Sequence, residues 1–142
     1  MLFRSFSRTE KSITLSPEMQ SLLGATEKVL PTEEIIKRLL MLDVDLLYNG
    51  GLGTYIKSTK EDHREVGDKT NDSVRVDGAD VRAKVVGEGG NLGVTQKGRI
   101  EFALKGGLID TDAIDNSGGV DCSDREVNLK ILFGPKIGRA HV

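Results

Sequence analysis

The sequence predicts an α/β fold in which a parallel sheet carries helices on its faces. Short apolar segments, which suit buried strands, alternate with segments whose apolar residues recur at helical spacing. Three of these apolar segments precede a glycine cluster, at residues 49–53, 88–93 and 115–119. Because ligands of parallel α/β sheets bind beyond the carboxyl ends of the strands, these clusters mark the expected binding edge.

Residues 1–15 are expected to form an irregular lead-in before the first helix. Ser16 suits the N-cap of that helix, Pro17 suits its first turn, and Gly24 suits its end. A second helix is predicted to open at residues 31–35, because apolar residues fall on one helical face and would pack against a sheet. The residues of this face are Ile35, Ile36, Leu39 and Leu40.

Residues 44–48 predict a core strand that ends at the first glycine cluster. Residues 58–61 have capping-box spacing, which predicts a mostly polar helix that continues to residue 74. Residues 74–82 predict a small hairpin that turns at residues 77–78, since Asp-Gly readily adopts the positive φ angles of tight hairpin turns.

Residues 83–87 predict a second core strand, and Thr95 suits the N-cap of the helix that follows the second glycine cluster. Leu108 and Ile109 are candidates for a third strand. The last cluster, residues 115–119, predicts a glycine turn ahead of a final helix. Together these elements would form a partial Rossmann-like parallel sheet with flanking helices.

The composition favours a small-molecule ligand over a nucleic acid or a membrane. The 142 residues carry a net charge of −2 with both signs well mixed, and no apolar run approaches the roughly 20 residues that span a bilayer. The single cysteine, Cys122, excludes an internal disulfide and a multi-cysteine metal cluster and suits a reducing cytoplasm. We therefore expect no nucleic acid, no membrane and no metal as a partner.

The first glycine cluster alone says little about function. Gly50, Gly51 and Gly53 only approximate the Gly-x-Gly-x-x-Gly fingerprint of dinucleotide-binding domains. A glycine turn that merely closes a strand is the simpler interpretation at this point, because glycine commonly follows strands.

Three stretches together resemble the large bacterial NAD-specific glutamate dehydrogenases. Residues 45–55 read DLLYNGGLGTY, residues 85–93 read VVGEGGNLG, and residues 114–126 read IDNSGGVDCSDRE. The last two also fit the wider amino-acid dehydrogenase pattern, except that Gly90 and Ser117 stand where that pattern has alanine.

The resemblance implies that the chain contacts NAD through amide side chains and glycine backbone. Because an amide both donates and accepts hydrogen bonds, Asn91 and Asn116 can hydrogen-bond a ribose hydroxyl or the carboxamide in the nicotinamide half of NAD. The structural alternatives are asparagines that bond their own turns and a Glu88 that bonds local amides. The implied cofactor-binding residues are Asn49, Gly50, Gly51, Glu88, Asn91 and Asn116.

The resemblance also implies that Val120 and Ser123 bind substrate in the complete enzyme. In the resembled family, residues matching 118–120 open a helix, the valine lines the side-chain pocket, and the serine contacts the distal carboxylate of glutamate. A hydroxyl at a helix N-terminus is a plausible partner for such an anion. Ser123 and Glu126 also have capping-box spacing, so a purely local role is the alternative.

The implied reaction is the oxidative deamination of L-glutamate to 2-oxoglutarate and ammonia, in a cytoplasmic homo-oligomer. The family's catalytic lysines and aspartate, and its phosphate-cradling fingerprint, precede this stretch, and the chain shows no match to them. We therefore expect residues 16–133 to be the distal part of a dinucleotide-binding domain, inactive alone. A non-catalytic nucleotide-binding, phosphate-binding or regulatory module is the alternative.

Residues 134–142 are expected to be a non-native tail. Residues 136–142 look like the translation of a sequencing-adapter read-through, so they are excluded from fold reasoning. The chain is therefore expected to be a fragment of a longer protein.

Overall fold

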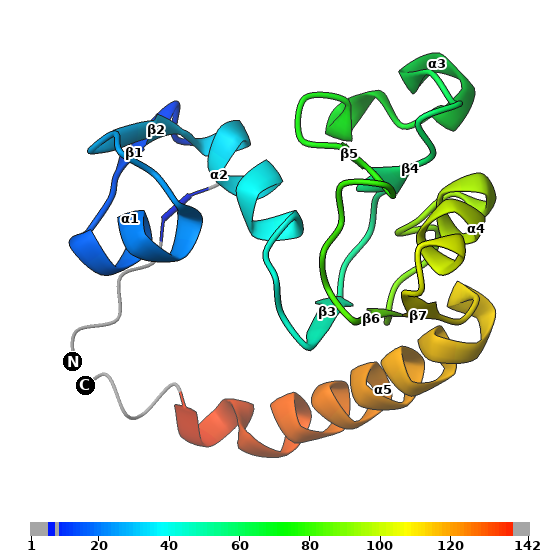
Figure 1. Ribbon diagram of the computed structural model, residues 1–142. Helices are drawn as coiled ribbons and strands as arrows, with labels where there is room; N and C mark the ends of the chain where they lie inside the picture. The colour runs from blue at the N-terminus through cyan, green and yellow to red at the C-terminus, as the bar shows by residue number, and fades with distance from the viewer. Residues whose placement is uncertain (1–5, 8, 138–142) are drawn as a thin grey trace.

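The computed structural model describes residues 6–7 and 9–137, apart from the side chains of Cys122 and of residues 134–137. Its N-terminal unit packs two short antiparallel strands beside two helices (Figure 1). These elements are β1 (Ser12–Thr14), α1 (Pro17–Leu23), β2 (Val29–Pro31) and α2 (Thr32–Leu40).

Both helices of this unit begin where the sequence predicts. The Ser16 hydroxyl accepts a hydrogen bond from the Met19 amide at 3.3 Å, and Gly24 ends α1 in the left-handed conformation, with φ at 60°. The expectation that residues 1–15 are irregular is wrong for β1, because β2 supplies a hydrogen-bonding partner that local sequence cannot reveal. The buried residues of the unit are Ile13, Leu15, Leu23, Leu30 and Ile35.

A three-stranded parallel sheet forms the centre of the molecule, which confirms the predicted α/β class (Figure 1). Its strands, in spatial order, are β3 (Leu46–Asn49), β6 (Val85–Glu88) and β7 (Leu108–Ile109). Leu46 pairs with Val85, and Val85 pairs with Leu108. All three strands therefore end at one edge of the sheet, where the segments expected to bind a ligand begin.

A second parallel pair replaces the predicted hairpin. β4 (Ile56–Lys57) pairs with β5 (Val76–Asp77), so the prediction of a hairpin that turns at residues 77–78 is wrong. A local turn does form at the Asp-Gly pair, since the Asp80 amide donates to the Asp77 carbonyl oxygen at 2.9 Å. The Gly78 amide, however, donates to the Lys57 carbonyl oxygen at 2.7 Å and so joins β5 to β4. The turn therefore follows a parallel strand pair and does not connect the two strands of a hairpin.

The polar segment between β4 and β5 forms less helix than predicted. α3 (His63–Val66) is capped by Asp62 and Glu65 rather than by residues 58–61, and Gly67 ends it with φ at 77°. A short 3-10 helix, η1 (Lys69–Asn71), follows. The predicted capping box forms only in part. Glu61 accepts from the Ser58 amide, but the Ser58 hydroxyl accepts from the Lys60 amide instead of the Glu61 amide, and the helix begins only after Asp62.

α4 (Gln96–Leu104) begins at the predicted cap, since the Thr95 hydroxyl accepts a hydrogen bond from the Gly98 amide at 3.0 Å. The helix packs on β4 and β7 and contributes Phe102 to the main core. The other buried residues of this core are Ile56, Val76, Val81, Ala83, Val86 and Val94.

α5 (Asp112–Ile137) is a single helix that passes along the base of the sheet (Figure 1). The predicted glycine turn at residues 115–119 is wrong, because these residues lie inside the helix. For the same reason Ser123 does not cap a helix, and residues 118–120 do not open one. The helix starts earlier because the Asp115 carboxylate accepts a hydrogen bond from the Glu88 amide at the end of β6, and the Asp112 carboxylate accepts one from the Leu92 amide in the loop that follows.

Candidate functional site

Three segments meet at the carboxyl edge of the sheet. They are residues 50–53 after β3, residues 89–93 after β6, and the first turns of α5. Glycines allow the close approach, since a Cβ on Gly90 would clash with the carbonyl oxygen of Gly51, and a Cβ on Gly119 would clash with that of Gly89. The three predicted glycine clusters therefore converge on one place.

Two predicted cofactor residues meet directly at this edge. The Asn116 Nδ2 donates a hydrogen bond of 2.7 Å to Asn91 Oδ1, although the residues are separated by 25 positions in the sequence. Asn91 is exposed and Asn116 is half-buried. Because this bond uses one polar atom of each amide, the second polar atom of each can meet a ligand.

Asn49 ends β3 beside these loops. Its Oδ1 accepts a long bond of 3.5 Å from the Gly51 amide. Its Nδ2 is buried and has no hydrogen-bond partner among the described residues. Such an atom is uncommon in folded proteins and marks a place where a partner is missing. The neighbouring Gly50 and Gly51 are exposed, so their backbone can be reached from outside.

The side chain of Glu88, for which the resemblance implies a contact with the cofactor, is completely buried in the structure. Its two carboxylate oxygens accept bonds from Arg99 at 2.7 and 3.0 Å, and one of them also accepts from the Val94 amide at 3.0 Å. Glu88 thus bonds one local amide, that of Val94, as the structural alternative expects, and the Arg99 side chain of α4 besides. Although burial opposes its charge, Arg99 has a raised pKa because Glu88 and Asp112 stabilise the guanidinium.

Asp112 and Asp115 were missed by the sequence analysis. The Leu92 amide donates to Asp112 Oδ2 at 2.9 Å, and the Glu88 amide donates to Asp115 Oδ2 at 3.0 Å. The bond from Leu92, aided by the charge of Arg99, holds the pKa of Asp112 below its usual range. Acidic residues directly after the third strand were the available signal, but the misplaced start of the last helix concealed it.

Leu92 adopts a strained backbone conformation within the second loop. Its φ of 53° lies in the left-handed region that bulky residues rarely occupy. Thr54 Oγ1 donates to its carbonyl oxygen at 2.7 Å, while Asp112 accepts from its amide. The loop is therefore held on both sides of the strained residue, as is common where strain persists.

Val120 and Ser123 lie farther along α5 and are exposed. They follow Asn116 by four and seven residues, which places all three on one face of the continuous helix. The structure therefore aligns the predicted substrate residues with a predicted cofactor residue. Val120 and Ser123 share a side of the molecule with Asn116 because they lie on the same face of one helix, not because they belong to one loop.

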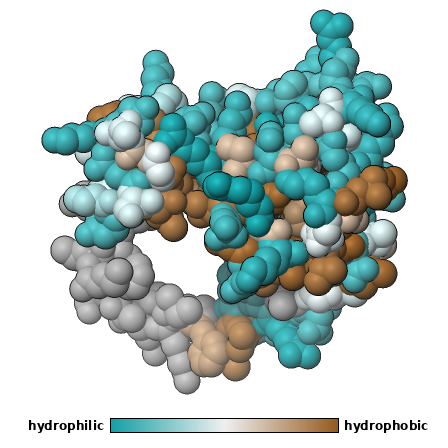
Figure 2. Space-filling model, in the orientation of Figure 1, coloured by the Kyte–Doolittle hydropathy of each residue, from teal (hydrophilic) through white to brown (hydrophobic). Residues whose placement is uncertain are grey.

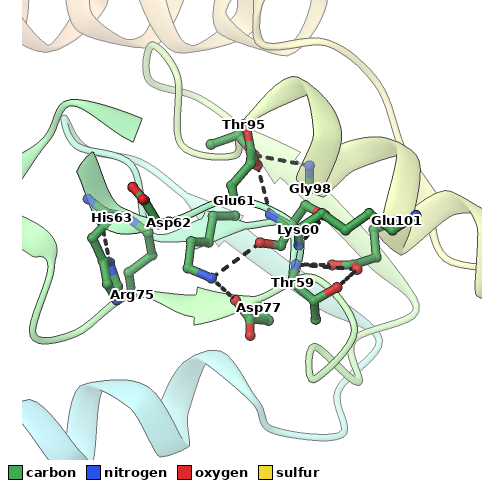
Figure 3. A network of polar contacts seen from close by, with 12 residues as sticks. Thr59, Lys60, Glu61, Asp62, His63, Arg75, Asp77, Thr95, Gly98 and Glu101 are labelled. Carbon is green, nitrogen blue, oxygen red and sulfur yellow. Dashed lines mark hydrogen bonds and ion pairs between the residues drawn. The ribbon is translucent and has the colours of Figure 1, made fainter. Parts of the chain in front are cut away.

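A separate polar network joins α4 to the loop after β4 (Figure 3). Glu61 accepts from the Ser58 amide at 2.9 Å and from the Thr95 hydroxyl at 2.6 Å. Glu101, on α4, accepts from the Thr59 amide at 3.0 Å. These bonds hold the helix that carries Arg99 beneath the second glycine loop.

Two structural features are absent from the part of the chain that the structure describes. No group of three or more His, Cys, Asp or Glu residues could hold a metal ion there. Within the same residues, no helix is long and apolar enough to cross a membrane.

Glycine loops and amide side chains at the carboxyl edge of a parallel sheet are typical of Rossmann-like α/β proteins. The comparison with family models identifies the family. Residues 4–142 match the family described as bacterial NAD-glutamate dehydrogenase, catalytic domain. The chain belongs to this family. The matched range includes residues 134–142, and the origin of that tail stays a prediction.

Three curated relatives named NAD-specific glutamate dehydrogenase are similar to most of the chain. The protein of Pseudomonas aeruginosa is 60% identical over 128 residues, which are 90% of this chain. Those of Halomonas elongata and Mycobacterium tuberculosis are 53% and 54% identical over 134 residues, or 94% and 90% of this chain. The chain spans only 8% of the length of each relative.

Proposed function

We propose that the complete protein to which this chain contributes is an NAD-dependent glutamate dehydrogenase. The reaction converts L-glutamate, NAD⁺ and water into 2-oxoglutarate, ammonium, NADH and a proton. The bond between Asn91 and Asn116 carries the proposal, because it joins two of the resembled motifs at the ligand-binding edge of a parallel sheet. Membership of the family supports the choice of cofactor and substrate.

The residues at this edge fit the nicotinamide half of NAD. Asn91 and Asn116 offer a free donor and a free acceptor, the Gly50 and Gly51 backbone is exposed, and Asn49 Nδ2 lacks a partner. We assign the cofactor contacts to these five residues and give Glu88 an indirect role. When bound, NAD supplies the hydride acceptor, and the protein supplies its orientation.

Substrate recognition is assigned to Val120 and Ser123. In this proposal the Ser123 hydroxyl donates a hydrogen bond to the distal carboxylate of glutamate, and Val120 contacts the methylene groups of its side chain. Both residues are exposed and lie on the helix face that carries Asn116, so the substrate would lie along α5 next to the cofactor.

The proton-transferring groups are assigned to parts of the protein outside this chain. We therefore propose that the 142-residue chain is inactive alone. From the resemblance, we also propose that the complete protein is a cytoplasmic homo-oligomer. Light scattering of the purified complete protein would measure its subunit number, and a monomer would contradict the latter proposal.

The test changes Asn116→Ala and Asn91→Ala, singly and together, in the complete protein. Each change should raise the KM for NAD about tenfold, which is the effect of losing roughly 1.4 kcal/mol of binding. Asn128→Ala is the matched control, since Asn128 is exposed on the same helix and bonds only the Asp124 carbonyl oxygen among described residues. Its KM should not change.

Two results would contradict the proposal. An unchanged KM in both asparagine variants would remove their cofactor role. A wild-type complete protein that binds NADH but does not oxidise glutamate would favour the alternative, a non-catalytic nucleotide-binding module.

A further inference from the structure

A buried arginine connects the second glycine loop to the start of α5. Arg99 donates from Nε to Glu88 Oε1 at 2.7 Å, and from Nη2 to Glu88 Oε2 at 3.0 Å and to Asp112 Oδ1 at 3.1 Å. Its Nη1 donates to Gln96 Oε1 at 3.0 Å. Three elements thus meet at one side chain, since Glu88 ends β6, Arg99 lies in α4, and Asp112 begins α5.

The two carboxylates that Arg99 binds also hold the backbone of the loop. Glu88 accepts from the Val94 amide, and Asp112 accepts from the Leu92 amide. The second bond holds Leu92 in its left-handed conformation. Between these anchors and the sheet lies Asn91, and one helical turn after Asp112 lies Asn116.

We propose that Arg99 is a positioning residue for the cofactor site, an inference that rests on the proposed function. By neutralising Glu88 and Asp112 together, Arg99 sets the distance between the second glycine loop and the first turn of α5. That distance determines whether the amides of Asn91 and Asn116 face the same ligand group. Arg99 itself is buried beneath the loop and does not touch the ligand.

The geometry requires an arginine rather than any cation. The planar guanidinium presents its donors in a fixed fork that matches two carboxylates at once. A lysine ammonium keeps the charge but acts as a point donor, so it cannot reproduce the paired bonds to Glu88 and the bond to Asp112. Arg99→Lys should therefore preserve the buried charge balance while loosening the loop against α5.

The experiment compares Arg99→Lys with wild type in the complete protein. Hydrogen exchange without any ligand should become faster in peptides that cover residues 89–95 and 112–118. The KM for NAD should rise by roughly tenfold to a hundredfold, since small misplacements in a preorganised site have effects of this size. The kcat at saturating NAD should change less than the KM.

A second set of variants tests whether a higher KM for NAD merely reflects a loss of folding. Arg99→Met removes the cation and leaves the buried Glu88 carboxylate without its charged partner, whereas Arg99→Met combined with Glu88→Gln removes the two opposite charges together. The double variant should recover thermal stability without recovering the KM for NAD. The control is Arg38→Lys, because Arg38 is a half-buried arginine on α2 that pairs with Glu34 and Glu27. It should leave exchange at residues 89–95 and the KM unchanged.

The outcomes separate this inference from the proposed function. Unchanged exchange in both peptides, or an unchanged KM in a less stable Arg99→Lys protein, would overturn the positioning role and reduce Arg99 to a structural residue. If wild type neither binds NADH nor oxidises glutamate, the proposed function fails. Faster exchange in Arg99→Lys would then still support the link between the loop and α5.

Discussion

At the scale of single residues, the site depends on glycines, which have no side chain, as much as on polar side chains. Gly90 stands where the wider amino-acid dehydrogenase pattern has alanine. The structure gives a reason, because a Cβ on Gly90 would clash with the carbonyl oxygen of Gly51. The second loop lies so close to the first that even a methyl group must displace backbone.

Gly90→Ala and Gly51→Ala should therefore differ sharply in effect. Gly90→Ala should lower the free energy of unfolding of the 142-residue chain by about 1–3 kcal/mol, as overpacking commonly does. Gly51→Ala meets nothing within 4 Å and should change stability by less than about 1 kcal/mol. Urea unfolding measures both. Equal effects would contradict the close contact between the loops.

At the scale of elements, α5 shows how tertiary contacts can extend a helix through glycines. The run of Asn, Ser and two glycines at residues 116–119 is typical of a turn, because each glycine costs helix stability. Asp115 accepts a hydrogen bond from the end of β6, Asp112 accepts one from the loop after β6, and Gly119 allows the helix to lie against the Gly89 carbonyl. These contacts fix the helix axis before the glycines are reached.

Alanine at the two neighbouring glycines tests this arrangement. Gly118→Ala should raise the free energy of unfolding by about 0.5–1 kcal/mol, because a Cβ there meets nothing within 4 Å and alanine favours helix. Gly119→Ala should lower it by about 1–3 kcal/mol, because its Cβ would clash with the Gly89 carbonyl oxygen. Thermal unfolding of the 142-residue chain distinguishes the two. A destabilising Gly118→Ala would favour the glycine turn that the sequence predicted.

At the scale of the whole molecule, one face of the parallel sheet is poorly covered. Leu46, Tyr48 and Leu108 line an open groove of about 570 Å³ under the first turns of α5. All three side chains are more than half exposed. Figure 2 shows a mostly hydrophilic upper surface, with hydrophobic side chains at mid-height and below, on the right over α4 and down towards α5. Exposed apolar surface of this kind favours association.

The purified 142-residue chain should therefore self-associate through this face. Leu108→Lys should shift the chain towards monomer, because Leu108 is 66% exposed at the groove. Leu22→Lys is the matched control, since Leu22 is 59% exposed on α1 and should leave association unchanged. Size-exclusion chromatography with light scattering at several concentrations measures the effect. A monomeric wild-type chain at every concentration would contradict the prediction.

The sequence by itself determined the features that depend on neighbouring residues. Ser16 and Thr95 mark their helix starts correctly because a cap bonds amides two or three positions away. The three parallel strands were also predictable, since short apolar segments followed by glycines are a local pattern. The resemblance of three motifs correctly predicted the family to which the chain belongs.

The tertiary structure alone decided the features that depend on distant partners. β5 pairs in parallel with β4, where the sequence predicted a hairpin. The start of α5 is fixed by the hydrogen bond from the loop after β6 to Asp112. The positioning role of Arg99 could not be predicted from the sequence, because it requires two carboxylates. One lies 11 positions before Arg99 and the other 13 positions after it. A buried charge is stable only with its partners, and the fold, rather than sequence spacing, brings these partners together.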